Sequence, residues 1–319
     1  MYSAIVTGGC GFIGSHLVRY LRQLGWRVII VDNFEGNYMR NLRGSPDCVP
    51  LFPLDARKIN KLPLLGHIDW FFHLAAHYAN EKSLKEPVKS VEYNVSGTMA
   101  CLDFCVKRGI KNFMYASSSG VYGQSKSGCY SETTLPQPST PYEVGKYAGE
   151  LLAKGHCDLY GMSLVAPRFF NVYGPGDIPG RWRSVVPNFF ELAANKRPIQ
   201  IYGDNSSREF TYIDDVIEGI YAAVKRVNLT AERQELVYNI CHGEETKIID
   251  LASEILKRCP PYIESPKIKP LREWDNAPRR YGDPALYYEL FKHVQKTKLA
   301  QGLDLSFEWY YANAVKGGM

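Results

Sequence analysis

The chain has 319 residues, of which 45% are hydrophobic and 22% charged, and this composition indicates a globular protein of one large domain or two smaller ones. No window approaches the roughly 20 uninterrupted apolar residues of a membrane span, and the N-terminus lacks the pattern of a secretory signal, so we expect a soluble, cytoplasmic protein without a membrane partner. The net charge of +5 is mild and no Lys/Arg run is long, which argues against nucleic acid and is compatible with a small anionic ligand.

The first predicted elements are an apolar strand at residues 3–7 ("SAIVT") and an amphipathic helix at 12–23. Between them, "VTGGCGFIGSHL" places Gly8, Gly11 and Gly14 in the spacing Gly-x-x-Gly-x-x-Gly. Three glycines alone are a weak signal, but the strand before them and the helix after them favour a turn at which the backbone approaches a pyrophosphate. That pyrophosphate would rest on the helix N-terminus. The stretch therefore predicts a dinucleotide site.

The second predicted strand, "RVIIVD", ends at Asp32, 18 residues after Gly14. A carboxylate there accepts hydrogen bonds from the adenosine ribose hydroxyls and repels a 2′-phosphate, which favours NAD over NADP. The alternative is that Asp32 is a turn residue before Asn33. Asp55, in "PLDARK", either reaches the adenine amino group or is an ordinary loop aspartate.

The elements that follow alternate between strands and helices up to about residue 170. In chain order they are "DWFFHLA", a helix at 91–107, "KNFMYASS", a helix at 141–159 and "SLVAPRF". Strands separated by helices of this length predict an α/β fold with a parallel, doubly wound sheet of the Rossmann type.

The regular alternation of strands and helices ends after Phe170, where Pro and Gly cluster in "NVYGPGDIPGRWR". We predict an NAD-binding domain at residues 1–170, with returning elements from about 210–245. A smaller C-terminal substrate-binding part would span 171–319, mainly 171–209 and 246–319. The short strands "PIQIYG" and "LVYNI" are expected to pack back on the first part.

Eight cysteines occur without a Cys-x-x-Cys pair, which argues against a disulfide framework and a zinc site. Cys101 and Cys105 are spaced i,i+4 on the predicted helix at 91–107, and small buried thiols explain them better than metal ligands. We therefore expect no bound metal.

A proton-transfer pair is predicted in "PYEVGK", where Tyr142 and Lys146 lie on one helix face. The ammonium would lower the pKa of the phenol, so that Tyr142 exchanges a proton with a substrate hydroxyl. The chain contains 22 tyrosines, so a Tyr-x-x-x-Lys pair can occur by chance and is weak evidence on its own. Upstream, however, "YASSSGVYG" ends a strand in hydroxyls, and Ser118 is placed to hold the reacting oxygen. The alternative for all three is polar turn residues near a helix; together they predict hydride transfer beside a nicotinamide.

Across nearly its whole length the chain resembles the extended short-chain dehydrogenases/reductases, in the nucleotide-sugar epimerase/dehydratase branch that includes UDP-galactose 4-epimerases. The motifs that carry the resemblance are "TGGCGFIGSHL", "HLAAH", "NVSGT", "YASSSGVYG", "PYEVGK", "PRFFNVYGPGD", "IYGDNSSREFTYIDDV" and "REWD".

The resemblance implies roles for residues along the chain. Ser118, Tyr142 and Lys146 would be catalytic. The residues implied for NAD binding are Gly8, Gly11, Phe12, Ile13, Gly14, Asp32, Asn33, Asp55, Ala56, Leu74, Ala75, Ala76, Asn94, Tyr142 and Lys146. Those implied for the nucleotide-diphosphate sugar are Ser118, Ser119, Asn171, Arg208 and Arg272, with the two arginines on the diphosphate, whose oxygens suit guanidinium groups. Each arginine alone would otherwise be a surface charge.

Departures from the family pattern narrow the expected activity. The dehydratases and decarboxylases of the branch carry acidic or distinctive residues just after the catalytic hydroxyl, where this chain has Ser119 and Gly120. Tyr78 replaces a lysine of the galactose epimerases. "DNAPRRYGD" is one residue longer than usual, and Arg279 and Arg280 either narrow the pocket, pair with a charged sugar or lie in solvent.

We therefore expect an NAD-dependent epimerase that inverts C4 through a transient 4-keto sugar, as in the conversion of UDP-glucose to UDP-galactose. A dehydratase or reductase of the same branch is the alternative, and a non-catalytic NAD-binding scaffold is a third possibility. The nucleotide base, the sugar and the carbon inverted stay open. By resemblance the chain forms a homodimer through a four-helix bundle, with apolar positions in 91–106 and 148–159.

Overall fold

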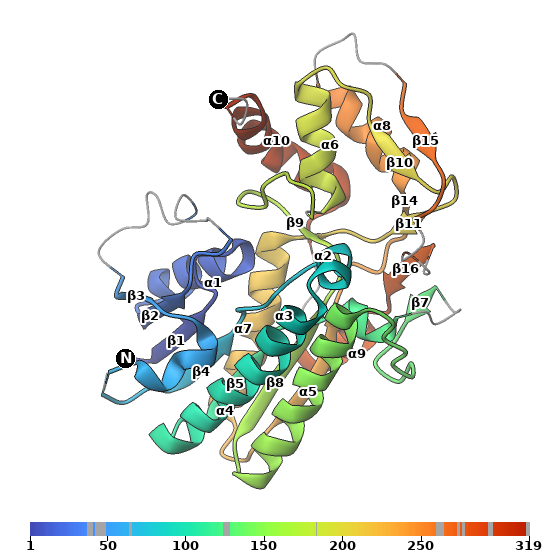
Figure 1. The fold of residues 1–319 in the computed structure, drawn as a ribbon. Helices are drawn as coiled ribbons and strands as arrows, with labels where there is room; N and C mark the ends of the chain where they lie inside the picture. The colour runs from blue at the N-terminus through green and yellow to red at the C-terminus, as the bar shows by residue number, and fades with distance from the viewer. Residues whose placement is uncertain are drawn as a thin grey trace. The chain divides into compact units, whose positions relative to one another are not determined.

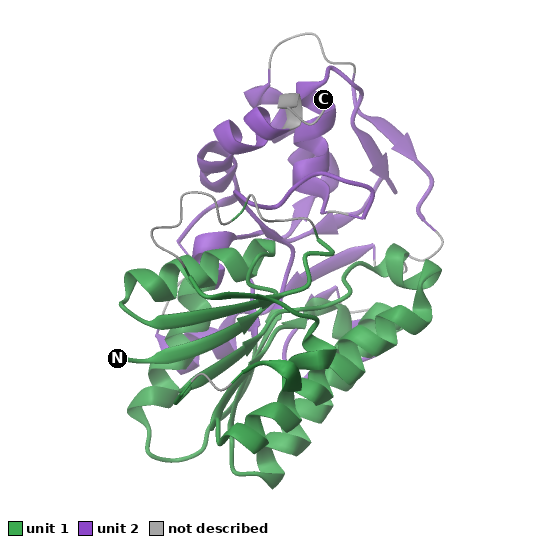
Figure 2. Ribbon diagram, turned by 60° about the vertical axis from the view of Figure 1, so that its left-hand side comes forward, with its two compact units in different colours: residues 1–121, 138–168, 217–238 green, residues 122–137, 169–216, 239–319 purple. Residues whose placement is uncertain are grey.

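The computed structural model describes residues 1–36, 41, 49–63, 66–123, 128–182, 184–259, 265–272, 275, 278–292 and 296–316. The chain forms two compact units (Figure 2): the first comprises 1–121, 138–168 and 217–238, and the second comprises 122–137, 169–216 and 239–319. The second unit thus includes residues 122–137, which the sequence analysis assigned to the first part.

The first unit is built on an eight-stranded sheet (Figure 1). Its strands are β1 (Ser3–Thr7), β2 (Arg27–Asp32), β3 (Leu51–Pro53), β4 (Trp70–His73), β5 (Asn112–Tyr115), β6 (Ser117–Ser118), β8 (Ser163–Phe169) and β13 (Glu235–Ile240). They lie in the order β13-β8-β5-β4-β1-β2-β3, with β6 on β8, and the pairs from β3 to β8 are parallel. The predicted doubly wound sheet is confirmed, and its strand order reverses between β1 and β4, where ligands bind in such sheets.

Helices cover both faces of this sheet. They are α1 (Phe12–Gln23), the 3-10 helix η2 (Ala56–Lys61), α2 (Asn80–Lys85), α3 (Pro87–Val91), the π turn η3 (Glu92–Ser96), α4 (Gly97–Arg108), the 3-10 helix η4 (Ser119–Tyr122), α5 (Pro141–Leu159) and α7 (Ile213–Leu229). No helix in the part of the chain that the structure describes is long and apolar enough to cross a membrane.

The core explains the apolar runs of the strands. Phe71 and Phe113 stack on one face and pack there with residues of α4 and α5. Trp70 and Phe72 stack next to each other, and the indole of Trp70 donates a hydrogen bond of 3.0 Å to Asn228 on α7. Because the central strands are buried on both faces, they read in the sequence as nearly continuous hydrophobic stretches rather than as alternating patterns.

Two predicted elements are interrupted where polar groups need backbone partners. The helix expected at 91–107 is instead α3, a π turn and α4, and within it the hydroxyl of Thr98 donates a hydrogen bond of 2.7 Å to the carbonyl of Asn94. The strand expected at "KNFMYASS" breaks at Ala116, whose carbonyl accepts a hydrogen bond from Lys146. By contrast, α5 has the predicted bounds, because Thr140 and Glu143 form a capping box at its start.

The second unit consists of small sheets and helices. Its strands are β7 (Cys129–Tyr130), β9 (Val172–Tyr173), β10 (Gln200–Tyr202), β11 (Ser207–Arg208), β12 (Thr211–Tyr212), β14 (Thr246–Lys247), β15 (Lys267–Lys269) and β16 (Arg279–Gly282). Its helices are α6 (Val185–Ala194), α8 (Ile248–Arg258), α9 (Ala285–Phe291) and α10 (Leu299–Lys316), and α6 packs on α10 through the stacked rings of Phe190 and Tyr310.

Of the two strands expected to return to the first part, one does so. "LVYNI" joins the large sheet as β13. The prediction for "PIQIYG" is wrong, because its core forms β10 and pairs in parallel with β15 inside the second unit. Its partner strand lies far along the chain, beyond the reach of a local pattern.

Candidate active site

The glycine loop of the first unit is compact and leads directly into α1. Gly8 has a φ of +71°, and a β-carbon built there would lie 2.7 Å from the backbone nitrogen of Ala75. A β-carbon on Gly14 would lie 2.1 Å from the carbonyl oxygen of Gly8. Gly11 is the N-cap residue of α1 and offers no side-chain cap to its first turn. The loop therefore leaves helix N–H groups for an anion, as the sequence predicts.

Asp32 lies beside this loop with both carboxylate oxygens engaged. One accepts a hydrogen bond of 3.0 Å from the backbone N–H of Cys10, and the other accepts one of 2.9 Å from Phe34. Burial raises the pKa of Asp32, and these backbone donors oppose that effect. The carboxylate is thus held at the end of β2, beside the glycine turn.

Asp55 has a local structural partner. Its side chain caps η2 by accepting from the backbone N–H of Arg57 at 2.8 Å, and the Arg57 guanidinium pairs with it at 2.7 Å. Burial alone would raise the pKa of Asp55, but the hydrogen bonds and the charge of Arg57 outweigh burial and lower this pKa. The structure therefore shows a capping role for Asp55, and its contact with adenine stays a prediction.

A buried hydrogen-bond chain links the end of β1 and the segment after β4 with η3. The hydroxyl of Thr98 donates to Asn94, so it accepts from Nε2–H of His73 at 3.2 Å. Nδ1 of His73 then accepts from the hydroxyl of Thr7 at 2.8 Å, and Thr7 in turn accepts from the N–H of Ala75 at 3.4 Å. Burial lowers the pKa of His73 to about 3, so this histidine is neutral. The chain fixes the backbone of two segments predicted to bind the cofactor.

Asn94 connects those segments to α5, the helix that carries the predicted catalytic residues Tyr142 and Lys146. Its amide bonds both the N–H and the carbonyl of His77, at 2.9 and 3.0 Å. A β-carbon built on Gly145 would lie 3.0 Å from the β-carbon of Asn94. Gly145 precedes Lys146, so α5 approaches η3 closely at the residues where chemistry is predicted.

The three predicted catalytic residues belong to neighbouring elements of the first unit. Ser118 ends β6, and its Oγ accepts a hydrogen bond of 3.1 Å from the N–H of Gly120. A β-carbon on Gly120 would lie 3.3 Å from Ser118 Oγ and 3.7 Å from Cε1 of Tyr142. The serine hydroxyl and the tyrosine ring therefore both lie next to Gly120, a residue that has no side chain.

Lys146 lies one helical turn after Tyr142 and is buried. Its ammonium donates a hydrogen bond of 2.8 Å to the carbonyl of Ala116 and lies 5.3 Å from the ring of Tyr115. Burial lowers the pKa of Lys146 to about 8. A cation in this position favours the phenolate form of a neighbouring tyrosine.

Sequence reasoning missed a second polar layer behind these residues. Glu150, one turn after Lys146, accepts hydrogen bonds from Ser117 at 2.5 Å and from Arg168 at 2.6 Å, and all three side chains are buried. Glu150 lies four residues after Lys146, which lies four after Tyr142, so the three share one face of α5, and this spacing is the signal that could have indicated the glutamate. Its partners on β6 and β8 have no comparable local signal.

The first unit fits a dinucleotide. The glycine cradle, which added β-carbons would fill, lies at a helix N-terminus, and a carboxylate stands at the end of the next strand. The residues that would hold the pyrophosphate belong to the loop around Gly8, Gly11 and Gly14, and Asp32 would hold the ribose.

Asn171, a predicted substrate residue of the second unit, has unusual geometry. Its φ is +30°, a left-handed backbone conformation that non-glycine residues rarely adopt. Among the described residues, its buried Nδ2 is one of a few side-chain polar atoms without a hydrogen-bond partner. Strain together with an orphaned buried donor is typical of a ligand-binding position.

Arg208 and Arg272, also in the second unit, differ in their environment. The side chain of Arg208 is 14% exposed and holds Asp275 with two bonds of 2.8 and 2.9 Å. Burial lowers the pKa of Arg208, and the charge of Asp275 opposes that effect. Arg272 is exposed, and its guanidinium lies 4.0 Å from the ring centre of Tyr202. Neither contact tests the predicted diphosphate role.

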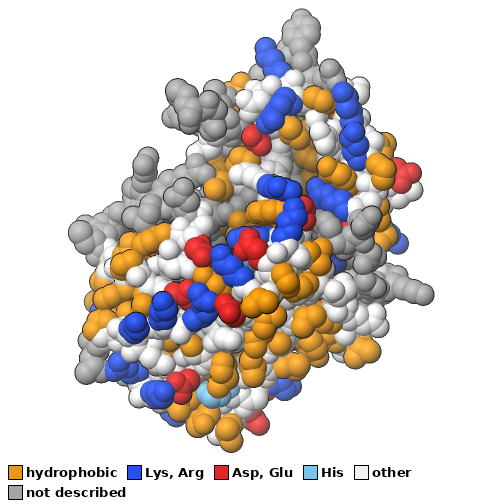
Figure 3. Space-filling view, in the orientation of Figure 1, with side chains coloured by type: hydrophobic (Ala, Val, Ile, Leu, Met, Phe, Trp, Pro, Cys, Tyr) orange, Lys and Arg blue, Asp and Glu red, His pale blue; other side chains and the backbone are white. Residues whose placement is uncertain are grey.

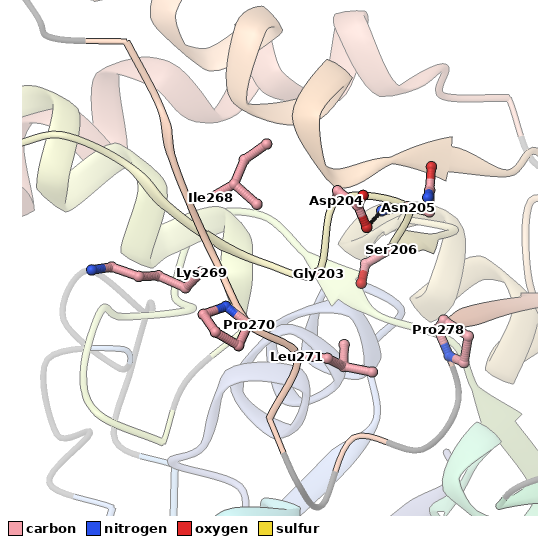
Figure 4. Close-up of a pocket in the computed structure, with 9 residues that line it drawn as sticks. All are labelled: Gly203, Asp204, Asn205, Ser206, Ile268, Lys269, Pro270, Leu271 and Pro278. Atoms are coloured by element: carbon pink, nitrogen blue, oxygen red, sulfur yellow. Dashed lines mark hydrogen bonds between the residues drawn. The ribbon is translucent and has the colours of Figure 1, made fainter.

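A cavity of about 390 Å³ lies in the same unit (Figure 4). It is lined by the turn Gly203, Asp204, Asn205 and Ser206, by Ile268, Lys269, Pro270 and Leu271, and by Pro278. The lining contains none of the predicted site residues. However, its residue Leu271 immediately precedes Arg272, and its residue Ser206 lies two positions before Arg208.

The chain matches a known family over most of its length. The sequence profile described as the NAD dependent epimerase/dehydratase family matches residues 4–241. A UDP-N-acetyl-α-D-glucosaminuronate decarboxylase of Bacillus cytotoxicus is 30% identical, with 96% of this chain and 97% of that protein covered.

Solved structures agree with this match. The UDP-glucose 4-epimerase of Thermotoga maritima, solved with UDP-glucose, is 29% identical with a TM-score of 0.89, covering 97% of this chain and 99% of that one. The UDP-glucose 4-epimerase of Thermus thermophilus, solved with NAD, is 27% identical with a TM-score of 0.83, covering 97% of this chain and 98% of that one. The similarity spans both units, so the predicted Rossmann-type fold with a smaller C-terminal part is confirmed.

Proposed function

Because the chain belongs to the NAD-dependent epimerase/dehydratase family and has NAD as its cofactor, we propose that it is an epimerase that inverts C4 of a nucleotide-diphosphate sugar. We further propose UDP as the nucleotide and a sugar of the glucose/galactose type. The observation that carries the proposal is the first unit's arrangement of Ser118 and Tyr142 around Gly120, with buried Lys146 one turn along the same helix.

In this proposal the bound NAD supplies the acceptor, and then the donor, of the C4 hydride. Tyr142, favoured as phenolate by the Lys146 ammonium, takes the proton of the C4 hydroxyl at its Oη and returns it when the sugar presents the opposite face. The hydroxyl of Ser118 donates a hydrogen bond to the same sugar oxygen while its charge changes. The hydrogen bond from Lys146 to Ala116 orients the ammonium toward the residue just before β6, the strand that carries Ser118.

The surroundings of Gly120 favour epimerisation over dehydration. Removal of water needs an acid beside the sugar, and the positions after Ser118 are Ser119 and Gly120. The nearest carboxylate side chain, Glu143, has its Cγ 3.2 Å from a β-carbon built on Gly120, but its oxygens accept hydrogen bonds from Asn80, Ser139 and Thr140 at 3.0 to 3.2 Å. These hydrogen bonds hold the Glu143 carboxylate at the start of α5, so it is not placed to donate a proton to the sugar.

The second unit supports a sugar-nucleotide substrate through Asn171, whose strained backbone and orphaned amide suit a ligand contact. We keep Arg208 and Arg272 as the proposed diphosphate residues. A uronate decarboxylase is the second candidate, because the Bacillus cytotoxicus relative with that name covers 96% of the chain. A dehydratase or reductase of the same family is a weaker alternative.

The test is to incubate the purified protein with UDP-glucose and, separately, UDP-galactose, and to follow the sugar by NMR and the reduced nicotinamide by absorbance. Epimerisation gives both sugars from either one without net change in absorbance and without added NAD. Loss of water would identify a dehydratase, and steady consumption of NADH, added in a parallel reaction, would identify a reductase. In a further incubation with UDP-glucuronate, release of carbon dioxide would identify a decarboxylase.

We also propose a homodimer that forms through α3 and α5. Apolar side chains gather over these helices on the surface of the first unit (Figure 3). On α5, Val144 and Leu151 are 47% and 50% exposed, two turns apart on one stripe, and Val88 on α3 is 71% exposed. Light scattering should give a dimer for the wild type and a monomer for Val144→Glu/Leu151→Glu. Leu229→Glu, at the exposed C-terminal end of α7, is the control. A monomeric wild type would contradict the proposal.

A further inference from the structure

Three separate segments of the first unit come together beside the predicted position of the adenosine. Asp32 ends β2 and pairs in parallel register with Pro53, which ends β3, so the segments that follow both strands leave the sheet at the same edge. Asp32 is the predicted ligand of the ribose, and Asp55, two residues after Pro53, is the predicted contact of the adenine. The adenosine of NAD would therefore lie between these two segments. The third segment, α3 with η3, contacts both of them.

The segment after β2 makes a tight, strained turn. Phe34 has a φ of +60°, a left-handed backbone conformation that costs energy for a residue with a β-carbon. Two hydrogen bonds hold the turn: the N–H of Phe34 donates to the carboxylate of Asp32 at 2.9 Å, and the N–H of Glu35 donates to the side chain of Asn33 at 3.1 Å. The turn thus places Glu35 three residues beyond the predicted ribose ligand, with its backbone fixed.

The carboxylate of Glu35 is bound by the third segment. The hydroxyl of Tyr93, on η3, donates a hydrogen bond of 2.9 Å to an oxygen of Glu35, and the ammonium of Lys89, on α3, lies 3.2 Å from the same oxygen. Burial, together with the hydrogen bond to Glu35 and its charge, raises the pKa of Tyr93 well above its ordinary value, so the phenol keeps its proton and stays a donor. Side chains 58 residues apart in the chain therefore tie the segment after β2 to η3.

The ring of Tyr93 is in turn held from the segment after β3. The guanidinium of Arg57 lies 4.0 Å from the ring centre, a distance at which a cation is attracted to an aromatic face. The same guanidinium pairs with Asp55 at 2.7 Å. Contacts therefore run from Asp55 through Arg57 to Tyr93. With the bond from Tyr93 to Glu35, they connect the two segments that flank the predicted adenosine position.

We propose that Glu35 and Tyr93 form a clasp over the adenosine of NAD, which must open before the dinucleotide leaves. The two residues act through their bond to each other, which holds the flanking segments together and so sets the rate of cofactor release. Exposed ion pairs contribute little, so the contact of Lys89 is secondary to the hydrogen bond that Tyr93 donates to a carboxylate. The inference rests on NAD as the cofactor and not on the reaction proposed above.

The test measures how fast NAD leaves the loaded protein. Protein carrying isotope-labelled NAD is mixed with excess unlabelled NAD, and the label that stays bound is followed with time. Tyr93→Phe keeps the ring beside Arg57 and removes only the hydroxyl. This variant and Glu35→Ala should each speed release about tenfold, the effect of one hydrogen bond to a charged group. The double variant should release NAD no faster than Glu35→Ala, because both changes break the same bond.

Glu92→Gln is the matched control. It removes an exposed carboxylate next to Tyr93 that pairs with Arg57 at 3.0 Å, and it leaves the bond between Tyr93 and Glu35 intact. Its release rate should stay within about twofold of the wild type, as expected for loss of an exposed ion pair. Measurement of Tm establishes that each variant is folded, and Glu35→Gln takes the place of Glu35→Ala if the alanine variant does not fold.

Three results would overturn the inference. One is a wild-type release rate in both single variants. Another is a double variant whose effect is the product of the single effects, which would mean that Glu35 and Tyr93 act separately. The third is equal acceleration by Glu92→Gln, which would assign the effect to surface charge in general. Because bound NAD is the readout, the proposed function fails separately: the predicted release rates without epimerisation of any sugar would support the clasp and reject the epimerase.

Discussion

The ammonium of Lys146 donates its hydrogen bond to the carbonyl of Ala116, the residue at which the chain leaves β5 and enters β6. This bond of 2.8 Å joins the first part of α5 to the residue just before β6, the strand that ends at Ser118. It also explains why the predicted strand is interrupted, since the carbonyl of Ala116 is turned to the lysine. The buried cation is thus fixed by backbone geometry rather than by a neighbouring carboxylate.

The burial of Lys146 predicts an alkaline limit to activity near pH 8. Burial lowers the pKa of Lys146 from its ordinary 10.5 to about 8. Above that pH the ammonium loses its proton, the phenolate of Tyr142 loses its favourable charge, and kcat/KM should fall. In Lys146→Arg the cation persists, because arginine keeps its proton above about pH 12, so this limb should disappear from the pH profile. A wild-type limb close to 10.5, or an unchanged limb in the arginine variant, would reject this assignment.

Replacing Tyr142 by phenylalanine should remove turnover while leaving the binding of NAD and substrate intact. The phenol oxygen is the proposed acid–base group, and loss of such a group lowers kcat by about 10²- to 10⁴-fold. Tyr147→Phe is the control, because it lies in the same helix and no catalytic role is proposed for it. The measurements are kcat, NAD content after denaturation and the Kd for UDP. Near-full activity in Tyr142→Phe would show that another group moves the proton.

The parts of the site that could be predicted from the sequence are those made by neighbours in the chain. The turn at Gly8, Gly11 and Gly14 follows a strand and opens a helix, and Tyr142 and Lys146 are one turn apart on α5. Such spacings are set by helix and strand geometry, so the residues share a face wherever the element packs. The alternation of strands and helices likewise predicted the parallel sheet.

The parts that could not be predicted depend on partners far apart in the chain. His73 bonds Thr7, 66 residues away, and Glu150 bonds Ser117, 33 residues away. A single sequence contains no signal for these pairs, because packing decides which side chains meet and which are buried. The pairing of β10 with β15 has the same origin.

Breaking the buried pair behind the site should destabilise the protein strongly. Arg168 and Glu150 are each 6% exposed in their side chains and 2.6 Å apart. In Glu150→Gln the guanidinium stays buried without its carboxylate, which costs about 3–5 kcal/mol of unfolding free energy. The double variant Glu150→Leu/Arg168→Met removes both charges and should regain most of that loss. Urea unfolding measures the difference, and a double variant no more stable than Glu150→Gln would contradict the explanation.

Two glycines of α5 should respond in opposite directions to alanine. A β-carbon on Gly149 would lie 2.2 Å from the hydroxyl oxygen of Tyr115, which is buried and donates a hydrogen bond to the carbonyl of Lys146. The ring must move, so Gly149→Ala should lose about 1–3 kcal/mol of stability. It should also lower kcat, because Tyr115 lies beside the Lys146 ammonium.

Gly155 is the matched position in the same helix, since an added β-carbon there meets nothing within 4 Å. Gly155→Ala should therefore gain up to about 1 kcal/mol from helix propensity alone, with kcat unchanged. Thermal unfolding of the two variants beside the wild type checks both signs. Equal shifts of Tm would mean that backbone propensity, rather than the approach of Tyr115, sets the response of this helix. Destabilisation confined to Gly149→Ala, with a fall in kcat, would tie the close packing of α5 on β5 directly to the position of the buried cation.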